Sequence, residues 1–123
     1  FFNYTGAFSV NRKSREVVES LQYAASLLHD PENMVLIYPQ GRLQSLYASQ
    51  FLFEKGIERI LQGREGEVQL LMSVNMIDYL AHRKPTLYIY LRDYEGPFWR
   101  EALEEAYNRF YADCLTIQTT RTE

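Results

Sequence analysis

The sequence has little of what would identify a narrow class at once. Its 123 residues include one cysteine, Cys114, so no intrachain disulfide can form. We expect Cys114 to be a small apolar residue on a helix rather than a reactive thiol. No apolar run approaches the roughly 20 residues that a membrane-spanning helix needs. The formal net charge of -3 supplies no basic excess for a nucleic-acid partner, and we expect none.

Motifs for several common chemistries are missing as well. The sequence has no P-loop and no G-x-G-x-x-G, and neither Ser45 nor Ser73 stands in a G-x-S-x-G elbow. The histidines, His29 and His82, lie far from each other and from Cys114 in the sequence, which does not give the ligand spacing of a zinc site. We therefore expect no metal site and no bound cofactor, and surface roles for both histidines.

The chain does contain hydrophobic periodicity of two kinds. Helical spacing of apolar residues predicts helices over 14–29, over 53–63 and from about Pro97 to Cys114. Short runs of strand-forming residues predict strands over 6–10, 34–38, 67–77 and 86–94. Strand, helix and strand in that order favour parallel strands with a right-handed crossover. We expect a single domain over residues 1–123, of the α/β class, with a mixed, mainly parallel sheet, helices packed on it and a frayed tail from 116.

A basic segment follows the first predicted strand. Arg12 and Lys13 come directly after residues 6–10, at the entry of a helix for which Ser14 can act as N-cap. The first N–H groups of a helix have no helical partner, so this entry is a reasonable anion site. A solvated basic loop is the equally simple alternative.

A second polar turn follows the strand predicted over 34–38. The apolar run stops at Pro39, and Arg42 lies within the turn "YPQGRLQS". If the two strands are parallel neighbours, both turns lie at the carboxyl edge of the sheet, where open α/β sheets bind ligands. Arg12 and Arg42 would then bind one phosphate through charge-assisted hydrogen bonds.

Three segments together resemble the glycerolipid and lysophospholipid acyltransferases. These are G-x-F-x-x-N-R (Gly6 to Arg12), V-L-I-Y-P-Q-G (35–41) and F-E-K-G-I (53–57). The family carries blocks of this kind in the same order, with a helix between the first two. The resemblance covers roughly residues 1–94 and implies that the chain is the C-terminal portion of an acyltransferase domain, with a glycerol-3-phosphate acyltransferase-like fold.

The family resemblance implies transfer of a fatty acyl group to a lysophospholipid hydroxyl in phospholipid biosynthesis. The acyl donor would be acyl-CoA or acyl carrier protein. In the family, a histidine of an H-x-x-x-x-D block is the general base. No such block occurs here, because His29 is followed five positions later by Met34 and His82 by Leu87. We expect the catalytic His and Asp to lie upstream, so that this fragment has no activity alone.

Site residues carry over from the family blocks one at a time. Arg12 matches the arginine of the first block, and Gly6 its glycine. The second block implies substrate-binding roles for Tyr38, Pro39, Gln40, Gly41 and Arg42. Gln40 replaces the family's glutamate, and the arginine has moved one place to Arg42. These departures favour a lyso-lipid head group other than glycerol 3-phosphate, such as an amino-acid lipid.

The expected partners follow from the same resemblance. They are the lysophospholipid acceptor, the acyl donor and a membrane surface on the cytoplasmic face of the cell membrane, reached peripherally or through a segment outside the chain. A homo-oligomer could form through apolar surface exposed by truncation. The alternative function is a non-catalytic α/β module that binds an anionic lipid or a protein partner. A third reading is an unrelated α/β protein.

Overall fold

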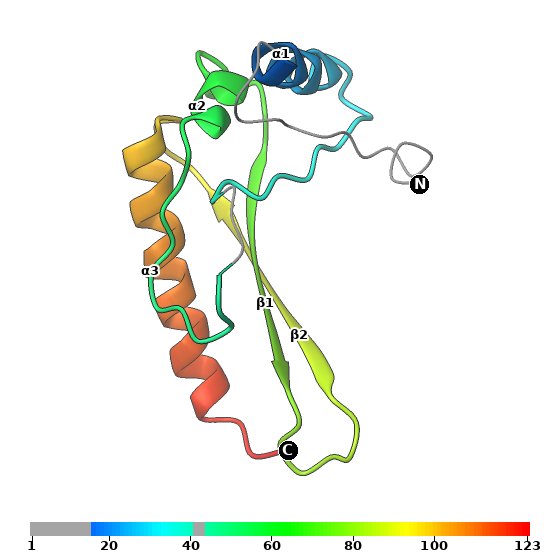
Figure 1. Ribbon diagram of the computed structural model, residues 1–123, viewed down its shortest axis with the longest axis vertical. Coiled ribbons are helices and arrows are strands. Elements are labelled where there is room, and N and C mark those ends of the chain that lie inside the picture. The colour runs from blue at the N-terminus through cyan, green and yellow to red at the C-terminus, as the bar shows by residue number, and fades with distance from the viewer. Residues whose placement is uncertain (1–15, 41–43) are drawn as a thin grey trace.

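The computed structural model describes residues 16–40 and 44–123, and the side chains from residue 18 (Figure 1). Within these ranges the chain forms three helices and two strands. In chain order they are α1 (Glu16–Leu27), α2 (Gly56–Leu61), β1 (Leu70–Asp78), β2 (Thr86–Tyr94) and α3 (Arg100–Thr119). The α/β class is confirmed in this broad sense. The strand predicted over 6–10 lies outside the described residues.

The described sheet is one antiparallel hairpin. β1 and β2 pair along their whole length, from Leu70 opposite Tyr94 to Asp78 opposite Thr86. The connection, residues 79–85, is too short for the crossover that a parallel pair requires. The prediction of a mainly parallel sheet is therefore wrong for the residues described.

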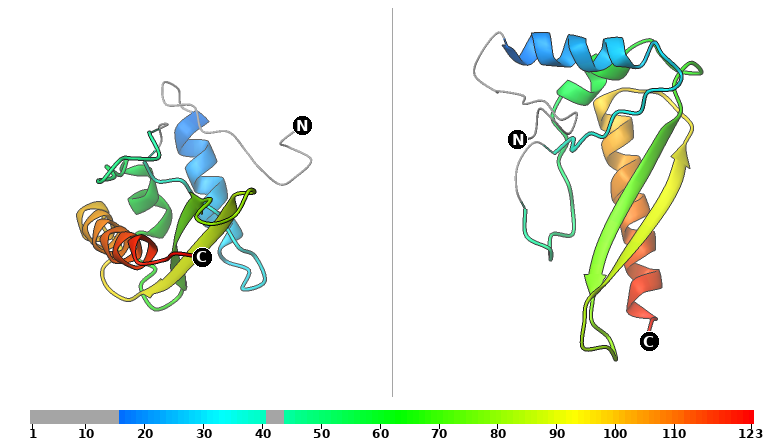
Figure 2. Two further views of the ribbon diagram at one scale, coloured as in Figure 1. Left: turned by 90° about the horizontal axis from the view of Figure 1, so that it is seen from below. Right: turned by 90° about the vertical axis from the view of Figure 1, so that its right-hand side faces the viewer.

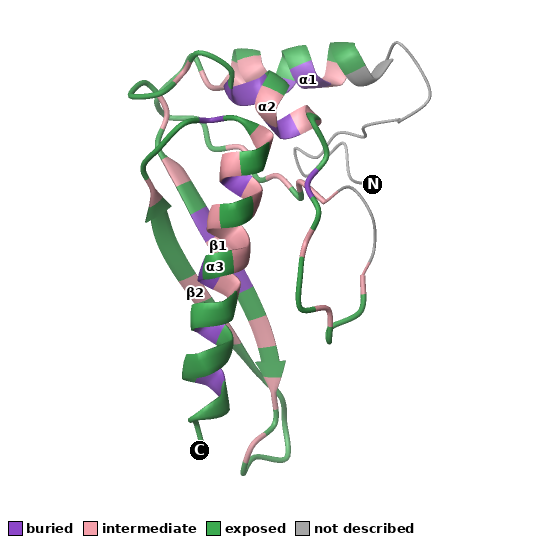
Figure 3. Ribbon diagram, turned by 90° about the vertical axis from the view of Figure 1, so that its left-hand side faces the viewer, coloured by how far each residue is buried: buried purple, intermediate pink, exposed green. Residues whose placement is uncertain are grey.

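Helix α3 runs along one face of the hairpin (Figure 1). Four buried residues form the core between these elements: Met72 and Val74 from β1, and Phe110 and Cys114 from α3. The Tyr107 hydroxyl also donates a hydrogen bond of 3.1 Å to the carbonyl of Ser73. The residues of α3 alternate between buried, intermediate and exposed along the helix (Figure 3). This packing matches the apolar stripe predicted for the last helix.

A second core lies at the end of the hairpin where β1 begins and β2 ends. Here α1 packs on α2, as two views show (Figures 1 and 2). Its buried members are Leu21, Ala24, Phe53, Ile57, Ile60, Leu61, Phe98 and Leu103. Gly56 lies at this contact, where a Cβ would stand 3.4 Å from a methyl carbon of Leu21, an ordinary van der Waals distance, so the packing does not require a glycine here.

The segment predicted as a buried strand over 34–38 is extended but belongs to no sheet among the described residues. Val35 and Ile37 pack against the second core, whereas Met34, Leu36 and Tyr38 are exposed. The prediction of a buried strand is therefore wrong for this segment. The apolar run reflects one covered side and one open side, which sequence cannot distinguish from burial on both.

The other elements agree more closely with the sequence. β2 has the predicted bounds, and β1 begins three residues later than predicted. The helix expected over 53–63 begins only at Gly56, because the backbone of Phe53 is extended and bonded to α3. Residues 116–119 continue α3 rather than fraying, since buried Gln118 bonds to the hairpin.

Truncation of Leu103 tests the importance of α3 packing. Leu103 is 1% exposed, so we expect Leu103→Ala to lower the free energy of unfolding by about 2–5 kcal/mol. Leu115→Ala is the matched control on the same helix, because Leu115 is 42% exposed; its effect should be about 1 kcal/mol or less. Urea denaturation followed by circular dichroism measures both. Equal losses would contradict the assigned helix orientation.

Candidate functional site

The turn that begins at Pro39 is the described part of the sequence-predicted site. It follows the extended segment 34–38 and is fixed by one backbone contact. The N–H of Glu54 donates to the carbonyl of Pro39 at 2.8 Å. This hydrogen bond brings two segments 15 positions apart to one place. The turn therefore depends on what holds Glu54 and the residues before it.

Helix α3 holds that segment through polar side chains. The Asn108 carboxamide accepts from the N–H of Phe51 at 2.8 Å and donates to its carbonyl at 3.0 Å. The Glu104 carboxylate accepts from the N–H of Phe53 at 2.8 Å. Arg100 donates to the Phe53 carbonyl at 3.4 Å and to Glu104 at 3.3 Å. These side chains satisfy backbone groups that a neighbouring strand would otherwise pair.

The side chains of the same segment pack against aromatic rings of α3. The Phe51 ring meets Tyr107 and Tyr111 edge to face, with centroids 5.4 and 4.9 Å away. Phe53 lies 5.5 Å from the same Tyr107 ring. Burial raises the pKa of Tyr107, so its hydroxyl remains protonated and donates to the β1 carbonyl described above. Residues 51–53, which we call the platform under the turn, are therefore held by α3 through both hydrogen bonds and ring contacts.

The turn itself presents groups that a ligand could use. Tyr38 is exposed, and Pro39 and Gln40 are half-buried. Farther along, the Gln44 side-chain oxygen is buried and accepts no hydrogen bond. A buried acceptor without a donor is uncommon, so a ligand that supplies an N–H or O–H would be favoured here. The hydroxyl oxygen of Ser45 is already used, since it accepts from the Tyr47 N–H at 3.1 Å.

Three of the six substrate-binding residues predicted from the sequence can be placed. Tyr38 ends the extended segment, and Pro39 and Gln40 form the start of the turn. Arg12, Gly41 and Arg42 lie outside the described residues, so the convergence of two guanidinium groups stays a prediction.

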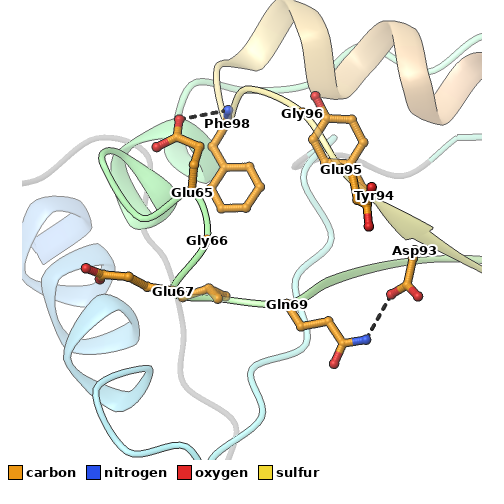
Figure 4. A pocket seen from close by; sticks show the side chains of 10 residues that line it. Glu65, Gly66, Glu67, Gln69, Asp93, Tyr94, Glu95, Gly96 and Phe98 are labelled. Carbon is orange, nitrogen blue, oxygen red and sulfur yellow. Dashed lines mark hydrogen bonds between the residues drawn. The ribbon is translucent and has the colours of Figure 1, made fainter.

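An acidic hollow that no sequence motif predicted lies where β1 begins and β2 ends (Figure 4). Its volume is about 630 Å³, and it lies between the start of β1 and the turn after β2. Four carboxylates line it: Glu65, Glu67, Asp93 and Glu95. The signal was present as two short acidic segments, "REGE" and "DYEG". A hollow of this charge repels a phosphate and attracts a cation, so it is not the predicted head-group site.

Local hydrogen bonds shape this acidic hollow. The Gln69 amide donates to Asp93 at 2.9 Å, and Glu65 accepts from the backbone N–H of Phe98 at 3.1 Å. The Tyr94 hydroxyl donates to the Pro97 carbonyl at 2.7 Å, and desolvation raises the pKa of that hydroxyl. Gly96, with φ of 155°, passes so close to this ring that a Cβ there would stand 3.0 Å from the hydroxyl oxygen.

The described residues show no other obvious chemical site. No group of three or more His, Cys, Asp or Glu among them could hold a metal ion. Cys114 is buried, and its burial raises the pKa of the thiol, which disfavours the reactive thiolate. His29 is exposed, and its Nε2 lies 3.0 Å from the Arg64 guanidinium. Among the helices described, none combines the length and apolar character needed to cross a membrane.

Comparison of the chain with protein-family models, with curated proteins and with solved structures finds no match. The family resemblance therefore depends on the three sequence blocks and on how the described parts of them are arranged.

Removal of the Asn108 carboxamide tests the platform under the turn. Asn108→Ala leaves both backbone groups of Phe51 without their partner, so we expect a loss of about 1–3 kcal/mol in unfolding free energy. Hydrogen exchange at the Phe51 amide should also accelerate. Arg109→Ala is the matched control, because its ion pair with Glu105 is exposed and contributes little. An unchanged Phe51 exchange rate in Asn108→Ala would contradict the role given to this side chain.

Proposed function

We propose that this chain is part of an acyltransferase that transfers a fatty acyl group from acyl-CoA or acyl carrier protein to the hydroxyl of a lysophospholipid or related lyso-lipid. The residues described here would supply part of the acceptor site. The observation that carries the proposal is the contact between two of the three sequence blocks. Glu54, from F-E-K-G-I, fixes the carbonyl of Pro39, from Y-P-Q-G, at 2.8 Å.

This contact supports the proposal because nothing in the composition of the two blocks predicts that they lie side by side. They are separated by a connection that contains Gln44 and Ser45, yet the fold brings their backbones into hydrogen-bonding distance. A head-group site needs such a fixed turn, since positioning of the acceptor hydroxyl contributes directly to rate. The platform under the turn, which α3 holds, supports it.

The acceptor's anionic group would be bound by arginine. Arg12 and Arg42 are the candidates, and each charge-assisted hydrogen bond would contribute about 1.5–3 kcal/mol if shielded from water. Gln40 and Gln44 can hydrogen-bond neutral or amino groups of the head group. Tyr38, exposed beside the turn, would contact the glycerol or acyl region.

The general base would come from outside residues 1–123. The family's H-x-x-x-x-D block does not occur in this sequence. In the proposed division of labour, a histidine elsewhere in the complete protein removes the acceptor's proton, and the turn described here holds the head group. The hairpin and α3 would belong to the C-terminal portion of the acyltransferase fold, with the reaction at a membrane surface on the cytoplasmic side.

A non-catalytic module that binds an anionic lipid or a protein partner is the second candidate. It is favoured by a different observation, that the H-x-x-x-x-D block does not occur in these 123 residues. In that case the turn would bind a ligand without chemistry. Activity of the complete protein separates the two functions.

The complete reading frame provides the direct test of acyl transfer. We expect the chain of 123 residues to show no transfer from acyl-CoA or acyl carrier protein to lysophospholipids. We expect the product of the complete frame to form the diacyl lipid, measured by radiolabelled acyl transfer and thin-layer chromatography. Absence of transfer with any of these donors, from a folded complete protein, would exclude the enzyme and leave the binding module.

Substitution of Arg12 tests its role in the complete protein. Because Arg12→Ala removes uniform binding of the head group, we expect the acceptor KM to rise roughly 10- to 100-fold with little change in the donor KM. Arg109→Ala, at an exposed position of α3, is the control and should leave both constants unchanged. A rise in the donor KM alone would place Arg12 on the other substrate.

A further inference from the structure

Helix α3 covers one face of the hairpin (Figure 2), and the other face exposes a row of aliphatic side chains. Because side chains alternate along a strand, the odd-numbered residues of both strands point away from the helix. Five of them, each 52% to 62% exposed, form what we call the outer row: Leu71, Ile77, Leu87, Ile89 and Leu91.

On β2, the side that carries the outer-row residues is more apolar than the side that faces α3. On the side that faces α3, β2 places Tyr88 and Tyr90, which are half-buried and contact Arg121. Hairpins normally turn their aliphatic residues inward and polar ones to water. On β2 the arrangement is reversed, because the aliphatic residues face outward and the tyrosines face α3. This arrangement favours a partner that covers the outer face.

The remaining outward residues leave this face almost free of charge. Ser73 donates a hydrogen bond to the Asn75 side chain at 3.2 Å, so these two satisfy each other. Asn75 stands opposite Ile89 at the centre of the hairpin. Asp93, at one end, is the charged residue of the face.

The two ends of the hairpin carry opposite charge. The connection at one end contains His82, Arg83 and Lys84, and neither Arg83 nor Lys84 forms an ion pair with another described residue. The other end carries the four carboxylates of the acidic hollow (Figure 4). Each strand has nine residues, which separates the ends by about 30 Å. Asp78, near the basic end, is occupied by the Gln118 amide.

We propose that the outer row binds a second copy of this chain, face to face, about a two-fold axis that runs across the strands. This axis places the basic connection of each copy on the acidic hollow of the other, so the charge contact occurs twice. The centre of the interface is Ile89 with Leu91 and Leu87, and Asn75 packs among them. The inference is independent of the acyltransferase proposal.

The exposed area is sufficient for such a dimer. Leucine or isoleucine residues that are half-exposed or more offer on the order of 100 Å² each, so the outer row offers on the order of 500 Å² per copy, near the upper limit for the largest apolar patch of a monomer. Two copies would bury about 1,000 Å² from this row alone, the lower bound for a specific interface. The charged ends add to it.

The charge arrangement favours a second copy over a lipid surface. An anionic membrane would attract the basic connection but repel Asp93, Glu95 and the rest of the acidic hollow, which border the same face. A second copy in the opposed orientation satisfies both ends. It also covers the aliphatic row without burying any charge that lacks a partner.

The first test is the molecular mass of the 123-residue chain in solution. We expect sedimentation equilibrium to show a reversible equilibrium between monomer and dimer. Ile89→Asp should yield monomer at every concentration up to several hundred micromolar. Ile117→Asp is the matched control, because Ile117 is an exposed isoleucine on α3, and it should retain the dimer. Circular dichroism and a cooperative urea transition confirm folding; if Ile89→Asp does not fold, Leu91→Ser replaces it.

The second test reverses the charges at the two ends. Arg83→Glu with Lys84→Glu should weaken dimerisation at least tenfold, and Glu67→Lys with Glu95→Lys should do the same. When a sample contains equal amounts of both folded variants, their mixed dimer should form more tightly than either variant alone, as measured by fluorescence anisotropy of one labelled variant.

Four results would overturn the proposal. A wild-type chain that remains monomeric at several hundred micromolar excludes the dimer. A monomer that sediments with phosphatidylglycerol vesicles assigns the face to lipid instead. A dimer that survives Ile89→Asp uses another surface. A dimer that is lost with Ile89→Asp but shows no preference for the mixed charge variants excludes the opposed orientation.

Discussion

The bonds from α3 to the backbone of residues 51–53 are the constraint on which the rest of the structure depends. Asn108 and Glu104 take the place of a neighbouring strand, and they do so from a helix. The segment they hold positions Glu54, which in turn fixes the carbonyl of Pro39. The turn is therefore coupled to α3 through side-chain-to-backbone hydrogen bonds at residues 51–53, through the ring contacts of Phe51 and Phe53, and through one backbone hydrogen bond at Glu54. The candidate site is thus held by a helix far away in the sequence.

The sequence predicted those elements in which the spacing of apolar residues is regular within the element itself. The alternation over 86–94 gave β2 with the right bounds, and helical spacing gave α1 and α3. The prediction of a buried strand over 34–38 was wrong, because a run of apolar residues looks the same in the sequence whether or not a neighbouring strand pairs with it. The predicted strand direction was also wrong. Parallel strands were inferred from the order of the elements, whereas the short connection between β1 and β2 makes the described pair antiparallel.

The candidate site shows the same division between local and distant information. A turn begins at Pro39 and Gln40, directly after Tyr38, as a proline and a nearby glycine after an apolar run indicate. No local signal marks Asn108 as the residue that orders Phe51, because the contact spans 57 positions. The acidic hollow was missed for a related reason: its carboxylates come from two segments that only the antiparallel register brings together.

The two faces of β2 differ in polarity because one of them binds α3. β2 directs tyrosines to α3, where their hydroxyls can bond to polar groups such as Gln118, at 2.6 Å from Tyr90. An aliphatic side chain in place of Tyr90 would remove one of the two donors to the Gln118 side-chain oxygen, which would keep its bond from Arg121, and the Gln118 amide would still donate to Asp78. The polar groups of α3 therefore favour tyrosine on the helix side of β2, and the aliphatic residues lie on the opposite face. An apolar outer face is the consequence of how α3 binds the hairpin, and a partner that covers it would complete the sheet's second layer.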